Sequence, residues 1–274
     1  MSEPELPSSY PPPPPPPPPI TPPPGYIAYG GPGAAMPHQF QPVKRFTTAL
    51  VVVLAVGLVI NLAAAIWQVV FANVAQRFLD GVITQREYDS AFDSLTQFSF
   101  IAFPLGIAGI VLSSIWSFRI AGTAVGAGRV PLTWKSGLTI LAWVLASILS
   151  CVFGLFGILP FLMLREHWRA SDPELGFGDP SWKSRPVSPL ITAWFVVNLV
   201  SQLAAIAASA AAVGSLIGNF DPNSADDAAA LAKQFTDQAD FIIPGAILSL
   251  IAGVLLILVI RALGARHMRL TREA

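Results

Sequence analysis

The densest group of chemically active side chains in this 274-residue chain stands at the end of a long apolar run. Segment 165–169 combines two arginines with a glutamate, a histidine and a tryptophan. Guanidinium groups bind phosphates and carboxylates, and tryptophan favours the membrane–water interface. The segment therefore predicts contact with a lipid headgroup or another anionic ligand, or simply an anchor for a helix end. The candidate contacts are Arg119, Arg165, His167, Trp168 and Arg169.

A histidine beside a glutamate also raises the question of metal binding or acid–base catalysis. A metal site takes three or four ligands, and adjacent residues of a helix do not face one centre. The other histidines, His38 and His267, lie near the two chain ends, which we expect to be flexible. The single cysteine, Cys151, excludes an internal disulfide and a multi-cysteine metal site. We expect no metal and no cofactor.

Motifs for the common enzyme chemistries do not occur in the chain. It contains no glycine-rich phosphate loop, nucleophile elbow or zinc-protease motif. Its 16 basic and 16 acidic residues balance, which gives no electrostatic basis for binding nucleic acid. We therefore expect a protein that is neither an enzyme nor a nucleic-acid binder.

Four carboxamide side chains stand inside otherwise apolar runs: Asn61, Gln68, Asn198 and Gln202. Asn61 and Gln68 are seven residues apart and Asn198 and Gln202 four apart, so each pair shares a helix face. Such residues either form hydrogen bonds between helices or line a path for a substrate. No acidic or basic residue lies in the middle of the predicted membrane spans described below. This argues against ion-coupled transport, which usually depends on such residues.

The elements that must position these residues are membrane helices. Hydrophobic residues make up 53% of the chain and charged ones only 12%, against about 25% charged in soluble domains. Four runs suit spans: about Phe46–Phe71, Ile101–Ile120, Pro189–Ile217 and Phe241–Leu263. Acidic loops at Asp80–Gln97 and Asp221–Asp240 carry apolar residues at helical spacing and should be largely helical. Pro104 and Pro244 should fall in the first turns of their spans.

The central apolar run, Leu138–Leu164, has an intermediate length. As one straight helix it would measure about 40 Å, too long for one crossing of about 30 Å and too short for two. Gly154, Gly157 and Pro160 interrupt it. These features favour a broken or re-entrant segment that returns to its starting side, with a single crossing as the alternative.

Charge distribution supports the re-entrant arrangement. Basic residues gather in cytoplasmic loops. If the central run returns to its starting side, only Arg77, Arg86 and Lys233 of the 16 basic residues fall outside. A simple five-crossing arrangement gives no convincing asymmetry, because it places six of the 16 basic residues on one side and ten on the other. We therefore expect an all-α polytopic membrane bundle in which two transmembrane hairpins flank the central segment, with both termini cytoplasmic.

The chain divides into five parts on these grounds. Residues 1–43 form a disordered proline-rich tail without the basic and apolar regions of a signal peptide, so we expect an uncleaved anchor. Residues 44–122 form the first hairpin with its acidic loop, and 188–266 form the second. Between them, 123–187 hold a basic inner loop, the central segment and the charged motif. Residues 267–274 form a basic cytoplasmic tail.

The charged motif resembles a known family. Glu166-x-Trp168-Arg169-Ala170-Ser171-Asp172-Pro173 after an apolar run with a late proline, together with Trp116-x-x-Arg119, is similar to the pattern of bacterial, mainly actinobacterial, membrane proteins labelled domain of unknown function 4328. The resemblance covers roughly residues 46–263. Thr123 stands where that family often has asparagine. The resemblance implies a bacterial inner-membrane protein and supplies no activity.

These observations predict a non-enzymatic membrane scaffold or sensor. Its basic inner face would engage anionic lipid, and Pro11–Pro24 would form a polyproline II segment for a cytoplasmic partner, or only a stiff spacer. The alternative function is a passive transporter or channel for a small solute, built around the broken segment.

Overall fold

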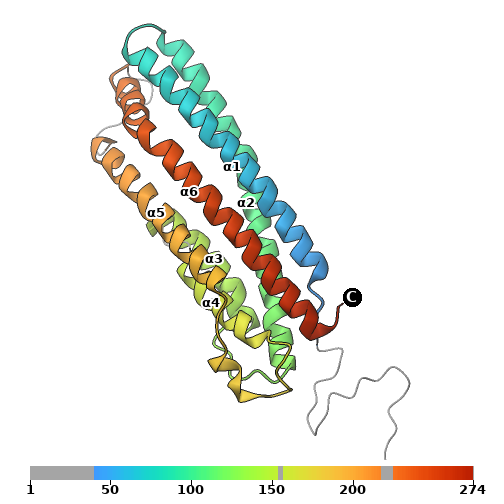
Figure 1. The fold of residues 1–274 in the computed structure, drawn as a ribbon. Helices are drawn as coiled ribbons and strands as arrows, with labels where there is room; N and C mark the ends of the chain where they lie inside the picture. The colour runs from blue at the N-terminus through green and yellow to red at the C-terminus, as the bar shows by residue number, and fades with distance from the viewer. Residues whose placement is uncertain (1–39, 154–156, 217–224, 274) are drawn as a thin grey trace, which may run out of the picture.

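The structure, a computed structural model, describes residues 40–153, 157–216 and 225–273. Within these ranges it consists of helices and turns, without a strand (Figure 1), which confirms the all-α fold. Several predicted features lie outside the described residues: the proline run Pro11–Pro24, Gly154 in the central run, and the end of the fourth run with the start of the second acidic loop, 217–224.

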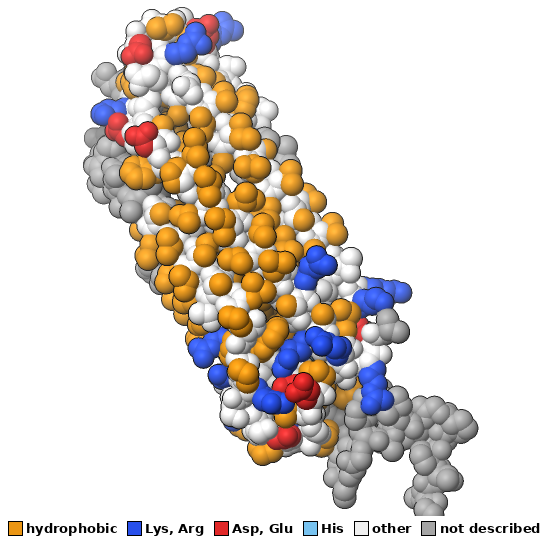
Figure 2. Space-filling model, viewed as in Figure 1, with side chains coloured by type: hydrophobic (Ala, Val, Ile, Leu, Met, Phe, Trp, Pro, Cys, Tyr) orange, Lys and Arg blue, Asp and Glu red, His pale blue; other side chains and the backbone are white. Residues whose placement is uncertain are grey.

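Four helices are long and apolar enough to cross a membrane: α1 (Lys44–Leu79), α2 (Gln85–Gly126), α5 (Pro189–Leu216) and α6 (Ala225–Thr271). Their large apolar side chains cover the visible face of the bundle between two charged ends (Figure 2). Exposure of so large an apolar surface to water is unfavourable in free energy, whereas the lipid chains of a membrane solvate it. The chain is therefore a membrane-embedded, multi-pass protein.

Three of these helices are much longer than the hydrocarbon core of a membrane is thick. α1, α2 and α6 contain 36, 42 and 47 residues. At about 1.5 Å per residue they reach about 54, 63 and 70 Å, roughly twice the hydrocarbon thickness. The acidic segments next to the spans are thus helical and continuous with them. At its other end, α6 extends to Thr271 and so includes most of residues 267–274, which were predicted to form a separate tail.

The acidic loops were predicted to rest an apolar edge on the bundle, and the described part does so. Phe71 of α1 packs against Tyr88 and Phe92 of α2 and against Phe235 of α6. The Phe71 and Phe235 rings meet edge to face, 4.7 Å between centroids. This aromatic cluster joins three helices beyond the apolar belt.

The placement of the two prolines in first turns was wrong. Pro104 lies inside α2 and Pro244 inside α6, far from either helix start. The sequence interpretation treated each acidic helical loop and the following span as separate elements, whereas each pair forms one helix. Membrane helices tolerate an interior proline because neighbouring groups and local adjustments satisfy the freed carbonyl.

The central run forms two helices, α3 (Ser136–Phe153) and α4 (Ile158–Ala170), broken within the predicted region. α4 returns to the end of the bundle from which α3 begins (Figure 1). Glu166 near the end of α4 accepts hydrogen bonds from the backbone N–H groups of Thr133 and Trp134, just before α3, both at 2.7 Å. α4 therefore ends beside the start of α3, which is the arrangement that the re-entrant interpretation predicts. The path of this pair through the membrane stays a prediction.

The helices pack side by side into one bundle, which has two distinct ends. α1 contacts α2 and α6, α5 contacts α6, and α3 and α4 fill the space between α2 and α5. α1 begins and α6 ends at one end, together with the short helix η2 (Pro180–Ser184), and we call this the basic end. The α1–α2 turn and the start of α6 form the acidic end, where six exposed acidic residues lie: Asp80, Glu87, Asp89, Asp93, Asp237 and Asp240.

Candidate functional site

Two regions of the molecule contain the predicted site residues: the basic end and a pocket in the middle of the bundle. At the basic end, α4 positions the charged motif. α4 begins after Gly157, with Pro160 in its first turn, and Ser171 follows its last residue. Trp168, near the end of α4, lies against Arg266 of α6.

Asp172, two residues after the end of α4, joins two distant parts of the chain. Its Oδ2 lies 2.8 Å from Arg185 Nε and 2.9 Å from Arg266 Nη2 of α6. The carboxyl is 3% exposed, so water screens these ion pairs weakly. Arg266 also lies 4.9 Å from the Trp168 ring centroid and donates to the Trp168 carbonyl at 3.1 Å.

Two further motif residues make backbone contacts. Glu166 holds the chain before α3, as described above, and Arg169 Nε donates to the Arg185 carbonyl at 3.0 Å. We call the group Glu166, Trp168, Arg169, Asp172, Arg185 and Arg266 the clasp. The clasp ties α4 to α6 and to the loops on both sides, so these side chains hold the basic end together.

The loop after α2 joins the loop after α4 through a buried cation. Arg129 is fully buried and donates to the carbonyls of Leu175 and Gly176. Burial lowers the pKa of its guanidinium, although nearby carboxylates of Asp172 and Asp179 oppose the shift. Gly128 has a φ of +74°, and a Cβ there would lie 2.8 Å from the Gly178 backbone, so the close approach requires glycine.

Two histidines lie inside the bundle near the clasp. His167 of α4 and His267 of α6 are both fully buried, and the His167 ring makes no hydrogen bond. His167 was predicted at the interface and His267 in a flexible end, but the structure places both in the interior. No group of three metal-ligating side chains occurs in the described ranges.

Arg119 and Arg165, the remaining interfacial candidates, make separate contacts. Arg119 donates to the Pro42 carbonyl at 2.9 Å and lies 4.2 Å from the Phe46 ring centroid, at the start of α1. Arg165 lies 5.3 Å from the Phe161 ring centroid on its own helix. The predicted anionic contacts therefore spread over the basic end instead of converging on one point.

The residues before α1 are fixed to the basic end. The Gln41 N–H donates to the Thr123 hydroxyl at 3.0 Å, and the Val43 and Lys44 N–H groups donate to the Glu273 carboxylate at 2.9 to 3.0 Å. Glu273 thus satisfies free N–H groups at the start of α1. Residues 1–39 join the described chain at this end.

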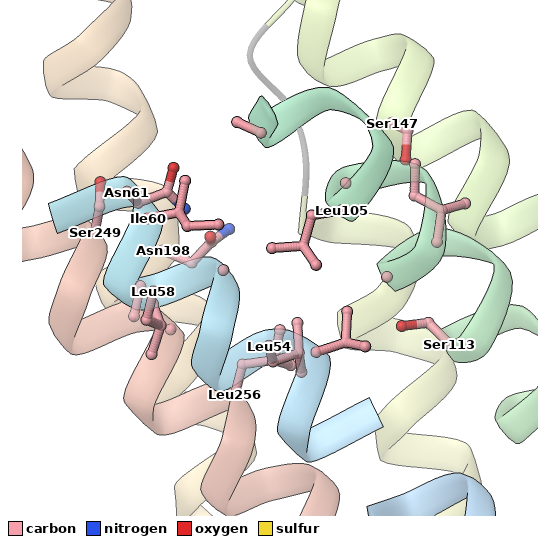
Figure 3. A pocket seen from close by; sticks show the side chains of 18 of the residues that line it. Leu54, Leu58, Ile60, Asn61, Leu105, Ser113, Ser147, Asn198, Ser249 and Leu256 are labelled. Carbon is pink, nitrogen blue, oxygen red and sulfur yellow. The ribbon is translucent and has the colours of Figure 1, made fainter. Parts of the chain in front are cut away.

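The second region is a pocket of about 510 Å³ in the middle of the apolar belt, lined by α1, α2, α3, α5 and α6. It brings together three of the four predicted carboxamides, Asn61, Asn198 and Gln202. Figure 3 shows Asn61 and Asn198 on one side and Leu105 and Ser113 of α2 on the other. Gln68 lines a neighbouring pocket of about 400 Å³, to which Asn61, Ser201 and Ser249 also contribute.

Some polar groups of the pocket have a hydrogen-bond partner in the protein, and others have none among the described residues. The Ser201 and Ser249 hydroxyls form a hydrogen bond between α5 and α6 at 3.0 Å. Ser147 donates to the Trp143 carbonyl at 2.9 Å. Within the described residues, the carboxamides of Asn61 and Asn198 make no hydrogen bond. The described residues that line the pocket include no charged side chain.

Sequence reasoning found the carboxamides but missed their surroundings. Serines and glycines occur throughout the apolar runs, and only their common facing direction marks Ser113, Ser147, Ser249, Gly106 and Gly109 as pocket residues. The Asp172 pairs were missed because Arg185 and Arg266 lie far away in the sequence. No protein-family model, curated protein or solved structure matches the chain.

Proposed function

We propose that this protein is a non-enzymatic membrane scaffold or sensor whose basic end engages anionic lipid. One observation carries the proposal: after the clasp has used Arg169, Arg185 and Arg266, the basic end still presents exposed cations. The exposed set is Lys44, Arg45, Lys135, Lys183, Arg261, Arg269 and Arg272. Each basic residue near an anionic membrane surface contributes about 1 kcal/mol to its attraction.

The orientation follows from the same charges. Positively charged residues favour the cytoplasmic side of a bacterial inner membrane, so we place the basic end and both termini in the cytoplasm. We also propose membership of the family labelled domain of unknown function 4328. The support for that assignment is the similarity of the pattern Glu166–Pro173 to the motif of that family.

The proline-rich tail supplies the second part of the proposal. Since Gln41 and Val43 are held at the basic end, the tail that contains Pro11–Pro24 joins the helices on the side that we assign to the cytoplasm. Polyproline II segments bind aromatic-lined grooves of partner domains at low entropic cost. The tail therefore acts as the docking element of the scaffold.

Retention of anionic lipid during purification tests the proposal. The exchanges Arg261→Gln, Arg269→Gln and Lys183→Gln together remove three exposed cations from the basic end without touching the clasp. We expect phosphatidylglycerol, counted per protein by lipid mass spectrometry, to fall several-fold. The matched control carries Arg77→Gln, Arg86→Gln and Lys233→Gln at the acidic end and should retain the lipid. Equal retention by both variants would overturn the proposal.

The central pocket favours a second candidate, a passive pathway for a small uncharged solute. A movement of α3 and α4 would open the pocket to one face of the membrane or to both. Vesicles containing the purified protein discriminate between the two: saturable flux of small uncharged solutes rules out a pure scaffold. Absent flux, together with capture of a partner by the proline tail, rules out the pathway.

A further inference from the structure

We propose that the central pocket is a binding site for one small uncharged amphiphile, a molecule with an apolar body and a hydrogen-bonding head. The pocket, its unpaired Asn61 and Asn198 and the open space in front of Gly106 and Gly109 point to this occupant. This inference goes beyond the proposed scaffold, because it requires neither the basic end nor the tail. It names the class of ligand for the pocket that the second candidate, the passive pathway, also uses.

The size and lining of the pocket suit such a ligand. Its volume of about 510 Å³ lies in the range of about 300–1,000 Å³ typical of small-molecule sites. Leucine, isoleucine and valine side chains of three helices and the rings of Trp143 and Trp194 supply most of the wall. An apolar body therefore fits most of the volume.

The free carboxamides define the head of the ligand. A carboxamide at membrane depth loses free energy unless its N–H₂ donors and its carbonyl find partners. Asn61 of α1 and Asn198 of α5 come from different helices and line the same pocket (Figure 3). Each offers a donor and an acceptor, so the matching head is an amide, a hydroxyl or a similar uncharged group.

The absence of charge among the described lining residues excludes an ionic head. A carboxylate or ammonium placed here would have no counter-ion, and such a group at the membrane centre costs about 2.5 to 3.5 kcal/mol or more. An ion would therefore bind at least about tenfold more weakly than an uncharged analogue of equal length.

Glycines create the space that the ligand occupies. Ala102, Leu105, Gly106, Gly109 and Ser113 recur at helical spacing on the pocket face of α2. A Cβ added at Gly106 or Gly109 meets no atom within 4 Å. A larger residue at these positions fills the pocket without a clash, and it also favours the helix more than glycine does.

Native mass spectrometry of the purified full-length protein in detergent tests the site with three probes: decanamide, decanoate and decane. We expect one decanamide per protein. Decanoate should bind at least about tenfold more weakly because of its charge, and decane should bind more weakly because it makes no hydrogen bond to Asn61 or Asn198. Gly106→Leu should lose decanamide, whereas Gly137→Leu, the same exchange at an open position outside the pocket, should bind as the original chain does. Asn61→Leu should bind about threefold to tenfold more weakly, from the loss of one neutral hydrogen bond.

Two arms distinguish the sources of the natural occupant. A bilayer-derived amphiphile would remain as a mass adduct on the freshly purified protein and be missing from Gly106→Leu. A solute from water would leave no adduct before decanamide is added. Absence of decanamide binding, equal binding by Gly106→Leu, or equal affinity for decanoate would overturn the inference and leave a water-filled junction between helices.

Discussion

The clasp and the central pocket both hold polar side chains inside the bundle, but they use them in opposite ways. In the clasp, Glu166, Arg169 and Asp172 each bond to another part of the chain. In the pocket, Asn61 and Asn198 bond to no described residue. Polar groups that are bonded to other parts of the chain hold those parts together. Polar groups that lack a partner within the apolar belt are available to bind a ligand.

Because of this difference, the carboxamides are better candidates for binding a ligand than the charged motif, which is the reverse of what the sequence suggests. The dense charged motif looks functional, yet the structure uses most of its members to join α4, α6 and two loops. The scattered carboxamides look like ordinary contacts between helices, yet two of them face a pocket of about 510 Å³ without partners. Four substitutions test whether the clasp and the pocket differ in this way, and they are given in order of decreasing effect on stability.

Asp172→Asn should cause the largest loss of stability. It leaves the guanidiniums of Arg185 and Arg266 without their shared carboxylate in a site where that carboxyl is 3% exposed. Breaking a buried ion pair on one side costs about 3 to 5 kcal/mol, and we expect the lower value because both arginines keep some water contact. Unfolding in detergent, followed by tryptophan fluorescence, measures the change.

Glu174 provides the matched control for this measurement. It also pairs with Arg185, at 3.1 Å, but its side chain is 79% exposed. Glu174→Gln should change stability by less than about 1 kcal/mol, as exposed ion pairs do. Equal effects at the two positions would show that the clasp is not a buried structural unit.

Glu166→Ala should cost about 2 kcal/mol, because it removes two charge-assisted hydrogen bonds to the N–H groups of Thr133 and Trp134. Glu166→Gln keeps one acceptor oxygen and should recover part of the loss. The same unfolding measurement applies. If Glu166→Ala is as stable as the original chain, the re-entrant hairpin does not depend on this contact.

Ser249→Ala tests a pocket residue that does have a partner. It removes the hydrogen bond to Ser201 between α5 and α6. Hydrogen bonds between membrane helices contribute about 0.6 kcal/mol on average, so a loss of that size is expected. Ser201→Ala should give the same loss, and the double variant should lose no more than either exchange alone.

Asn61→Leu should have the smallest effect on stability, within about 0.5 kcal/mol or slightly stabilising. No described group loses a hydrogen bond, and the leucine removes an unsatisfied carboxamide from the apolar belt. Unfolding of the protein freed of bound amphiphile measures the change. A loss above about 1 kcal/mol would mean that Asn61 has a structural partner, and the contrast with the clasp would fail.

Part of this architecture was predictable because its causes are local. The long apolar runs predicted the helices, and the glycines and Pro160 predicted the break between α3 and α4. Apolar residues at helical spacing predicted that the acidic loops are helical and pack on the bundle, as Phe92 and Phe235 do on Phe71. Pro104 and Pro244 misled the interpretation, because proline marks a helix start in many sequences and lies in the interior here.

The candidate sites were less predictable because they depend on contacts between distant residues. Nothing near Asp172 indicates that Arg266 lies beside it, and the position of His267 near the chain end gave no sign of burial. Asn61 and Asn198 were identified as polar residues on helix faces, but their convergence required the packing of α1 and α5 around a shared space.

The amino-acid sequence was sufficient to predict an all-helical membrane bundle with a broken central segment and a strongly asymmetric placement of charge. Those properties follow from hydrophobic length, helix geometry and backbone chemistry, each of which acts within a few turns. The packing of the helices was needed to show that Asp172 forms ion pairs in the clasp while Asn61 and Asn198 have no described partner. The reason is that a polar group is satisfied or not by its neighbours in space, and in a helical bundle most of those neighbours come from other helices.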